Sequence, residues 1–289
     1  MTSNKTKRPE ITTSQRPKSK TVDVYDEYDQ IKSFQITGEL PLTIYVNKKE
    51  VVTLMTLGHY PESLVIGYLR NQGFVAELAD IESVQVDWDT NSAAVKSINN
   101  LNDFENKITH RVVTSGCGQG TTFGGIWDDL KGKNLQTKKL KQSSIYKILK
   151  LLHDKNEIYR KSGAVHGCAI CDENNIIDFI EDVGRHNAVD AIAGNMWLNG
   201  INSENKIFYT TGRLTSEMVI KVAQMNISYL ISRSGITEMG LNVAKETGVT
   251  LIGRAKGRHF LVYHGHGNIV YDKKPDPRPE GSPDIWKRR

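Results

Sequence analysis

Cysteine is scarce in this sequence, with three residues among 289. Three cysteines are too few to hold a chain of this length together by disulfides, so a disulfide-built secreted scaffold is excluded. Long apolar runs are also missing, which excludes a helix that spans a membrane, and no apolar stretch follows the charged N-terminus as in a secretory signal peptide. Internal repeats are absent. With 38% apolar and 25% charged residues, the chain is predicted to be a globular protein of the cytoplasm.

The chain has a small excess of positive charge, with 38 Lys and Arg against 33 Asp and Glu. Positions 1–20 contain six of the basic residues and only one acidic residue, Glu10, so this segment carries the whole excess. The segment is otherwise rich in Thr, Ser and Pro, which predicts a disordered basic tail over residues 1–22. Because the rest of the chain is neutral, we expect no nucleic-acid binding. Four prolines near the other end predict a second tail over 273–289.

The pattern of apolar residues changes midway through the body of the chain. Alternation at 42–46 and 51–57, and again at 84–88 and 94–98, predicts two hairpins with a helix from Pro61 between them. From Ser144 onward, predicted helices alternate with predicted strands, which is typical of an α/β layered domain. The sequence therefore predicts a smaller β-rich N-terminal domain over 23–135, ending in a glycine-rich loop, and an α/β C-terminal domain over 136–272.

Cys117 lies in that glycine-rich loop, next to Gly116 and Gly118. Glycines leave the backbone free and shield the sulfur little, whereas a structural cysteine more often lies in an apolar strand or helix. The position suits a nucleophile or a group carrier. A loop cysteine without a function is the alternative.

His166, Cys168 and Cys171 resemble part of a zinc site, but their spacing argues against one. On a strand, residues 166 and 168 share a face and residue 171 points to the other, and no second pair completes four ligands. A zinc deaminase would need Glu where Cys168 stands. We therefore expect no metal site, and we expect Cys168 and Cys171 to be ordinary strand residues.

Arginine and glycine follow three predicted strands, in 210–213, 232–235 and 253–259, together with hydroxyl residues in the first two segments and with Lys256 and His259 in the third. Such residues at strand ends and helix starts bind phosphate well, and ligands collect at the carboxyl ends of strands in α/β sheets. A fourth polar segment, 181–187, opens a predicted helix, although capping and ion pairing could also explain it. Neither GxGxxG nor GxxxxGK[ST] is present. We expect an anionic ligand such as a nucleotide, with these candidate residues: Arg185, His186, Arg213, Arg233, Ser234, Arg254, Lys256, Arg258 and His259.

Several of these segments, in this order, resemble the formate dehydrogenase accessory sulfurtransferase family, FdhD. The resemblance extends over about residues 35–265, and the run EDVGRHNAVD is its most distinctive part. The matching segments are Glu39–Ile44, Gly67–Leu69, Thr114–Gly118, Gly163–His166, Glu181–Asp190, Thr211–Met218 and Ser232–Ser234.

The resemblance implies a function. Members of this family accept sulfur from a cysteine desulfurase as a cysteine persulfide. They pass it to the molybdenum of a bis(molybdopterin guanine dinucleotide) cofactor, which the catalytic subunit of formate dehydrogenase requires. Cys117 matches the persulfide cysteine, and the family's late cofactor-binding segment matches Gly253, Arg254, Ala255, Lys256, Gly257, Arg258 and His259. The resemblance also implies a cytidine deaminase-like fold, no cofactor of the protein's own, and a homodimer.

Two positions depart from the family pattern. Some members have a second cysteine where this chain has Gly120, so a single carrier thiol is favoured, and Lys256 stands where Arg is usual, which removes the planar fork of the guanidinium. Two other functions remain open at this point. One is a chaperone that binds the nucleotide cofactor without covalent sulfur transfer, and the other is a zinc hydrolase of the deaminase type.

Overall fold

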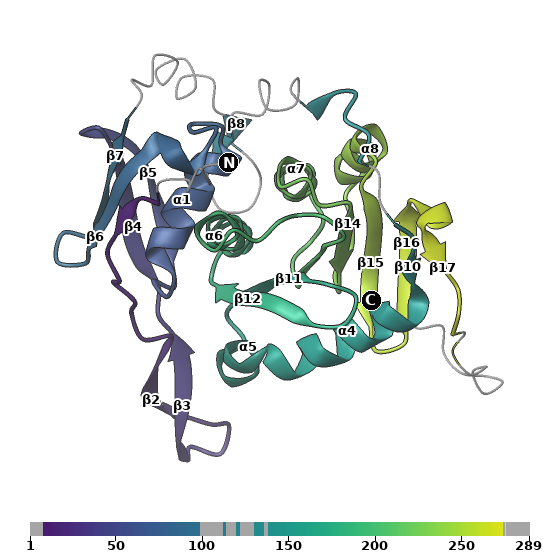
Figure 1. Ribbon diagram of the computed structural model, residues 1–289. Coiled ribbons are helices and arrows are strands. Elements are labelled where there is room, and N and C mark those ends of the chain that lie inside the picture. Colours follow the sequence, from purple (N-terminus) through teal and green to yellow (C-terminus); the bar gives the residue numbers. More distant parts are fainter. Residues whose placement is uncertain are drawn as a thin grey trace.

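The computed structural model describes residues 8–98, 112–113, 120–121, 130–135, 138–273 and 275. Two large sheets and the helices between them make up most of the described chain (Figure 1). The mixed α/β class predicted from the sequence is confirmed, whereas the likeness to the cytidine deaminase core stays a prediction. No helix in the described part of the chain is long and apolar enough to cross a membrane.

The first sheet contains five strands in the order β1-β6-β7-β4-β5. Both predicted hairpins are confirmed, since β4 pairs antiparallel with β5 and β6 pairs antiparallel with β7. Helix α1 covers one face of this sheet, and a short 3-10 turn, η1, precedes β6. The elements are β1 (Glu10–Ile11), β4 (Leu40–Val46), β5 (Lys49–Thr56), α1 (Pro61–Asn71), η1 (Leu78–Asp80), β6 (Ile81–Asp87) and β7 (Ser92–Ser97).

The second sheet contains six strands in the order β12-β11-β13-β14-β15-β16. Its three central strands, β13, β14 and β15, run parallel, and an antiparallel hairpin closes each side. The strands are β11 (His166–Cys171), β12 (Ile176–Asp182), β13 (Ile207–Thr210), β14 (Tyr229–Ser232), β15 (Thr250–Lys256) and β16 (His259–His264).

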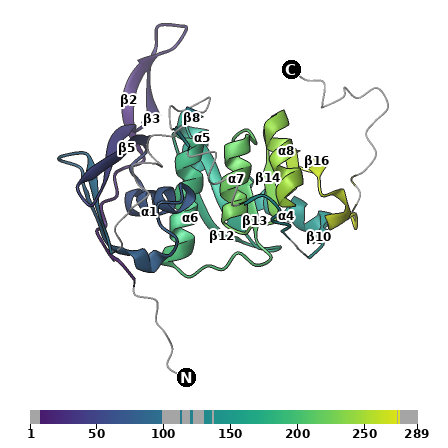
Figure 2. The same ribbon diagram turned by 90° about the horizontal axis from the view of Figure 1, so that it is seen from above.

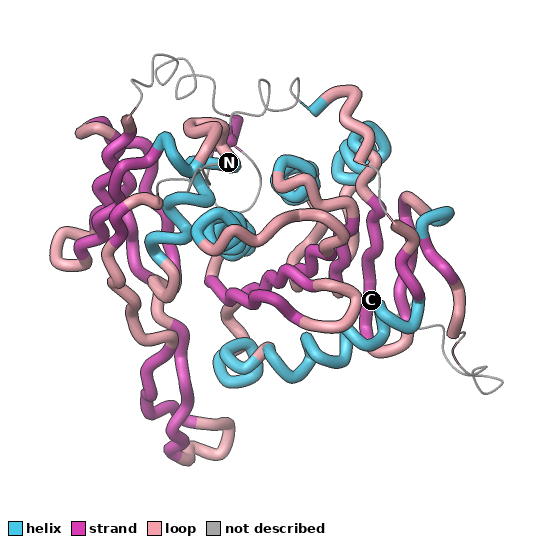
Figure 3. Tube along the Cα trace, viewed as in Figure 1, coloured by secondary structure: helices cyan, strands magenta, loops and turns pink. Residues whose placement is uncertain are grey.

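Helices cover both faces of the second sheet, as Figures 2 and 3 show. Three helices pack on one face with the larger cluster of buried apolar residues: α6 (Arg185–Leu198), α7 (Ser216–Gln224) and α8 (Glu238–Thr247). The other face is covered by α4 (Gln142–Lys155), which α5 (Glu157–Ser162) follows. Helix α4 presents Ile145, Ile148 and Leu149 to the sheet, because residues three and four apart share one side of a helix.

Three small strand pairs complete the described chain. Strands β2 (Ser19–Tyr25) and β3 (Ile31–Thr37) form a two-stranded arm, and the pair β8 (Val112–Val113) and β9 (Gly120–Thr121) is antiparallel. Strands β10 (Leu140–Lys141) and β17 (Ile269–Val270) pair in parallel, and the turn η2 (His266–Asn268) precedes β17. The carboxylate of Asp272 then accepts hydrogen bonds from the amide and the hydroxyl of Ser143, at 2.9 and 2.6 Å, so it caps the start of α4.

The prediction of a disordered tail over residues 1–22 is wrong for residues 10–11 and 19–22, which lie in strands. Strand β1 pairs in parallel with β6. The hydroxyl of Thr12 donates to Glu62 on α1 at 2.8 Å, and the indole of Trp88 donates to the carbonyl oxygen of Ser14. Polar residues of this segment therefore find buried partners in the folded body, which a count of apolar residues cannot detect.

Helices α1 and α6 join the two sheets through one continuous core (Figure 1). Their crossing contains one glycine from each helix. A methyl group on Gly67 would collide with the carbonyl oxygen of Asp190, and one on Gly194 would collide with that of Ser63. The two backbones are therefore in direct contact, which only glycine permits. The predicted division at residue 135 consequently does not separate two independent cores.

Candidate functional site

A cavity of about 810 Å³ lies between helices α4 and α5 and the turn that joins β15 to β16. The sheet contributes its floor through Tyr209 on β13 and Ala255 on β15, and Arg233 follows the end of β14. The full lining is Ser143, Tyr146, Lys147, Leu149, Lys150, His153, Asn156, Tyr159, Arg160, Tyr209, Arg233, Ala255, Lys256, Gly257, Arg258 and Lys273. We call it the basic cavity.

The lining of the basic cavity carries charge of one sign. Its cationic side chains come from helices, strand ends and the hairpin turn, and the described lining contains no Asp or Glu. Lysine and arginine groups that converge on a concave surface raise the local positive potential, and they bind phosphate oxygens through charge-assisted hydrogen bonds. The cations are Lys147, Lys150, Arg160, Arg233, Lys256, Arg258 and Lys273.

Aromatic rings accompany these cations. The guanidinium of Arg233 lies over the ring of Tyr159, 5.6 Å from its centre, and the ring of Tyr146 lies 5.9 Å from that of Phe260. Burial raises the pKa of Tyr209, so its phenol stays protonated. Planar rings beside cations suit a ligand that has both a flat base and phosphates.

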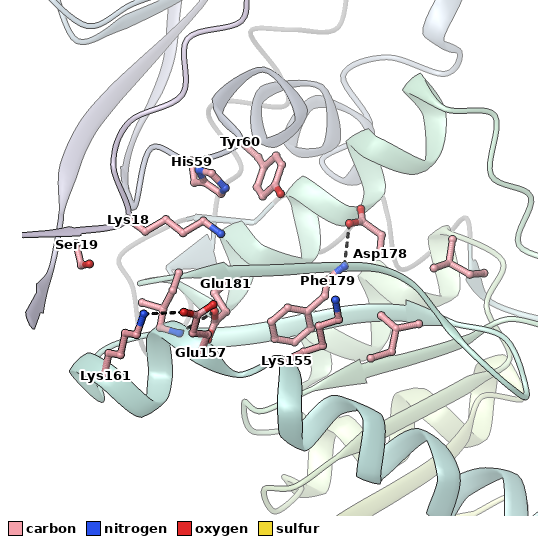
Figure 4. Close-up of a pocket in the computed structure, with 13 residues that line it drawn as sticks. Lys18, Ser19, His59, Tyr60, Lys155, Glu157, Lys161, Asp178, Phe179 and Glu181 are labelled. Atoms are coloured by element: carbon pink, nitrogen blue, oxygen red, sulfur yellow. Dashed lines mark hydrogen bonds and ion pairs between the residues drawn. The ribbon is translucent and has the colours of Figure 1, made fainter.

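A second cavity of about 460 Å³ lies beside the edge strand β12, with Lys18 pointing into it (Figure 4). Lysines and carboxylates are balanced in its lining: Lys18, Lys155 and Lys161 against Glu157, Asp178 and Glu181. The ammonium of Lys161 lies 2.6 Å from Glu157, and Glu181 accepts hydrogen bonds from the amides of Ile158 and Tyr159. This cavity is thus a poorer place for a polyanion than the basic cavity.

The structure brings five of the predicted ligand residues together in the basic cavity: Arg233, Ala255, Lys256, Gly257 and Arg258. The segment 253–259 is not a loop after a strand, as the sequence analysis expected, but the tip of the β15–β16 hairpin, with its turn at Gly257 and Arg258. A bulge between Gly253 and Lys256 interrupts the alternation of side chains, so the apolar pattern ends before strand β15 does.

The other predicted ligand residues do not line the basic cavity. Gly253 and Arg254 lie beside Ser234, whose carbonyl oxygen accepts a hydrogen bond from the Arg254 amide at 2.8 Å. His259 begins β16. Arg213 is exposed. Burial lowers the pKa of His166, and the charges of Arg185 and Arg213 lower it further. The part of these residues in ligand binding stays a prediction.

Arg185 and His186 begin helix α6, and both are buried, at 5% and 1% exposure. The imidazole Nε2 of His186 lies 3.3 Å from the carboxylate of Glu217 on α7. Burial lowers the pKa of His186 to about 3, against the opposing effect of Glu217, so the imidazole is neutral. The structure places both side chains inside the protein, away from the basic cavity.

His186 is the outer member of a buried polar network. The ammonium of Lys221 lies 2.8 Å from Asp190 and 3.5 Å from Glu217, and the amide of Asn71 on α1 donates to Asp190 at 2.7 Å. The network therefore ties α1, α6 and α7 together. Paired charges of this kind hold a geometry. Segment 181–187 contributes His186 to it as a neutral imidazole, so the network does not support an ion-pair explanation of that segment.

Cys117, the predicted carrier, lies outside the described residues. Cys168 and Cys171 are free, buried strand residues that face opposite sides of the sheet, as expected. Burial raises the pKa of each thiol to about 12, so neither is a nucleophile at neutral pH. Within the described part of the chain, no three His, Cys, Asp or Glu residues are grouped as a metal site.

Sequence reasoning missed the helical wall of the basic cavity. Lys147, Lys150 and His153 follow one another at intervals of three on α4, and Arg160 follows on α5. Such spacing puts them on one side of the helix, opposite Ile145 and Ile148. The spacing of Lys147, Lys150 and His153 was the available signal, but a solvated helix face has the same pattern.

The chain is similar to known proteins over most of its length. A family model described as the FdhD/NarQ family matches residues 37–270. The chain is 33% identical over 247 residues to the sulfur carrier protein FdhD of Listeria monocytogenes serotype 4b (strain F2365), covering 84% of this chain and 94% of that protein. It is 30% identical over 238 residues to the protein of the same name from Bacillus subtilis (strain 168), and this match covers 82% of this chain and 90% of that protein.

A solved structure is similar over most of the chain. A crystal structure of a protein from Desulfotalea psychrophila, described as a putative formate dehydrogenase accessory protein, superposes with a TM-score of 0.69 at 26% identity. The match covers 87% of this chain and 98% of that one.

Proposed function

The chain belongs to the FdhD/NarQ family, and from this premise we propose that it is a sulfur carrier for the maturation of formate dehydrogenase. It receives persulfide sulfur from a cysteine desulfurase on Cys117 and passes it to a molybdenum-bound bis(molybdopterin guanine dinucleotide). That cofactor is cargo, destined for the catalytic subunit of formate dehydrogenase, and the transfer takes place in the cytoplasm.

The basic cavity carries this proposal. A guanine dinucleotide arm has a flat base and a pyrophosphate, and the cavity offers tyrosine rings together with lysines and arginines that face no carboxylate in the described lining. Lys256 and Arg258 on the hairpin and Lys150 on α4 contribute to opposite walls, so phosphates between them would contact both.

The first transfer needs no reagent beyond the two proteins. The thiolate of Cys117 attacks the outer sulfur of the desulfurase persulfide, and the sulfur–sulfur bond of the desulfurase breaks. A new sulfur–sulfur bond forms on Cys117, and the desulfurase cysteine leaves as a thiolate. Cys168 and Cys171 cannot substitute for Cys117, because both are buried and their pKa values are about 12.

Intact mass spectrometry tests the covalent step. The protein is incubated with a cysteine desulfurase and cysteine, and a sulfur adduct of about 32 Da is expected. The adduct should disappear in Cys117→Ala and persist in Cys171→Ala. An adduct that persists in Cys117→Ala would contradict the assignment of the carrier cysteine.

The mass measurement, together with GDP binding and formate dehydrogenase activity in cells, separates the carrier from a chaperone that only holds the cofactor. If wild-type protein binds GDP but gains no sulfur, and Cys117→Ala still supports formate dehydrogenase activity in cells, the chaperone function is correct instead. Binding of GDP, measured by calorimetry, tests the nucleotide part of the proposal independently of Cys117.

A further inference from the structure

The cavity of about 460 Å³ beside β12, which we call the edge cavity, runs along the open side of the second sheet (Figure 4). Strand β12 is the outermost strand of that sheet, and among the described strands it pairs with β11 alone. Residues 176–179 and 181 of this strand line the edge cavity. Main-chain groups of an edge strand that face away from its sheet are available to pair with an extended ligand.

The pairing of β11 shows which main-chain groups of β12 face the edge cavity. The carbonyl oxygen of Gly167 on β11 accepts a hydrogen bond from the residue that follows β13, so the main chain of Gly167 faces β13. This direction alternates along a strand, so Cys168 faces β12, where it is paired with Ile180. The main chain of Phe179 therefore points away from the sheet. Its amide donates to Asp178 at 2.8 Å, and no described residue donates to its carbonyl oxygen.

A positive charge lies at one end of the edge cavity. Lys18 points into it, and its ammonium forms no ion pair with a described residue (Figure 4). Burial raises the pKa of Glu181 against two amide hydrogen bonds and the charge of Lys18. The ammonium of Lys18 therefore lies near the end of β12 that carries Glu181. Both oxygens of Glu181 already accept hydrogen bonds from amides of α5.

A negative charge lies farther along the strand. Asp178 accepts hydrogen bonds from two neutral groups, the main-chain amide of Phe179 and the side chain of Asn195. No cation lies within ion-pair distance of this carboxylate in the described chain. Burial raises the pKa of Tyr60, and the charge of Asp178 raises it further, so the phenol lies beside the carboxylate. A partly buried carboxylate without a cation is a favourable place for an ammonium group.

The distance between the two charged ends limits the length of the ligand. Asp178 and Glu181 are three residues apart on β12, which corresponds to about 10 Å along a strand. A ligand that brings an ammonium to Asp178 and a carboxylate to Lys18 must span this distance. An extended peptide of three residues does so, whereas a single amino acid is too short. Its main chain would lie beside the outward peptide groups of β12, and the side chains of Ile177 and Phe179 offer apolar contacts.

We propose that the edge cavity binds a short peptide of about three residues, extended along β12, with its free amino group at Asp178 and its free carboxylate at Lys18. The near balance of lysines and carboxylates in the lining suits a ligand without net charge. The proposal is independent of the sulfur carrier function, because the edge cavity and the basic cavity share no lining residue.

Calorimetric titration of the full chain with trialanine tests the site without any substitution. Trialanine is expected to bind, and N-acetyl-trialanine and trialanine amide should each bind at least tenfold more weakly, because each lacks one of the two terminal charges. Absence of binding at about 10 mM trialanine would overturn the proposal. Capped peptides that bind as tightly as trialanine would also overturn it, since the ligand would then be an internal segment of a longer chain.

Substitution of Lys18 tests the place of the ligand carboxylate. Lys18→Met should weaken trialanine binding about fivefold or more, and it should leave the affinity for trialanine amide unchanged, because the amide has no carboxylate to lose. Lys20→Met is the matched control, since Lys20 is exposed and does not line the edge cavity. Equal weakening for the free and the amidated peptide, or an equal effect of both substitutions, would contradict the assignment of Lys18.

Asp178→Asn tests the other end in the same way. It should weaken trialanine binding and leave the affinity for N-acetyl-trialanine unchanged, because the acetylated peptide carries no ammonium. The amide of the new side chain keeps an acceptor for the Phe179 amide, so the strand edge is expected to persist. Unchanged affinity for trialanine in Asp178→Asn would show that the amino group lies elsewhere and would overturn the proposed direction.

Discussion

The ammonium of Lys221 on α7 lies 2.8 Å from the carboxylate of Asp190 on α6, and both side chains are at most 1% exposed. Asn71 of α1 binds the second oxygen of the same carboxylate. A buried carboxylate is tolerated only with such partners. The pair therefore marks the place where three helices depend on one another.

Replacing Lys221 by Met should lower the free energy of unfolding by about 3–5 kcal/mol, because Asp190 and Glu217 then lose their buried cation. Combining it with Asp190→Leu should recover part of the loss, since one of the two unpaired carboxylates is then removed. Urea unfolding followed by fluorescence measures both effects. A single variant as stable as the wild type would show that the pair does not hold the helices.

His186 should make the protein less stable in acid. Its pKa is about 3 in the folded protein against 6.5 for an unperturbed histidine. As the pH falls through this range, the unfolded chain takes up a proton that the folded chain does not. The free energy of unfolding then falls by about 1.4 kcal/mol per pH unit from this group.

His186→Asn should flatten that dependence. Asp182 and Asp190, whose pKa values burial raises, change stability in the opposite direction, but they are present in both proteins. The difference between the two slopes, from urea unfolding at several pH values, therefore reports on His186. Equal slopes would mean that the imidazole is protonated in the folded state.

Gly67→Ala should cost about 1–3 kcal/mol or prevent folding, because the added methyl group collides with the backbone of α6. Gly267→Ala is the matched control, since nothing lies within 4 Å of its new methyl group and its φ is not positive. Thermal unfolding compares the two. Similar melting temperatures for both variants would show that α1 can move away from α6 at little cost.

Lys150→Ala and Lys256→Ala should each weaken GDP binding about tenfold, because each removes a cation from a wall of the basic cavity. The effect should shrink at high salt, as it does for exposed charges. Lys245→Ala on α8, which is exposed and does not line the basic cavity, serves as the control. Calorimetric titration with GDP measures all three. Unchanged affinity in both cavity variants would place the nucleotide elsewhere.

The thiols of Cys168 and Cys171 should resist alkylation in the folded protein, since both are buried with pKa values of about 12. A Cys117→Ala protein treated with iodoacetamide near neutral pH should gain no adduct, and the same protein in denaturant should gain two. Mass spectrometry counts them. A rapidly alkylated native variant would contradict the burial of this strand.

Much of the fold could be predicted from the sequence because its strands and helices carry regular periods. The alternation in 42–46 and 51–57 follows the pleat of β4 and β5, and the apolar spacing of α4 follows its contact with the sheet. Pairing between strands far apart in the sequence could not be predicted. Strand β1 is only two residues long, and its partner β6 lies far along the chain, so no local pattern indicates it.

The site could be predicted only in part, because some of its residues come together through contacts between elements far apart in the sequence. Arg233 and Lys256 were found because strand ends are general ligand positions. The helical wall with Lys147 and Lys150 becomes recognisable only once α4 is placed across the sheet. Arg185 and His186 were expected among the ligand residues, yet their side chains are buried at the start of α6, where the imidazole lies next to Glu217.

The glycine crossing between α1 and α6 also bears on how the chain folds during synthesis. Helix α1 ends at Asn71 and leaves the ribosome long before α6, which begins at Arg185. Until α6 arrives, the apolar side of α1 and the first sheet lacks its cover, and that intermediate is open to aggregation or to capture by a chaperone. Ribosome-bound chains that end before residue 185 should therefore be cut by protease in the first sheet, and chains long enough to expose α6 should resist it.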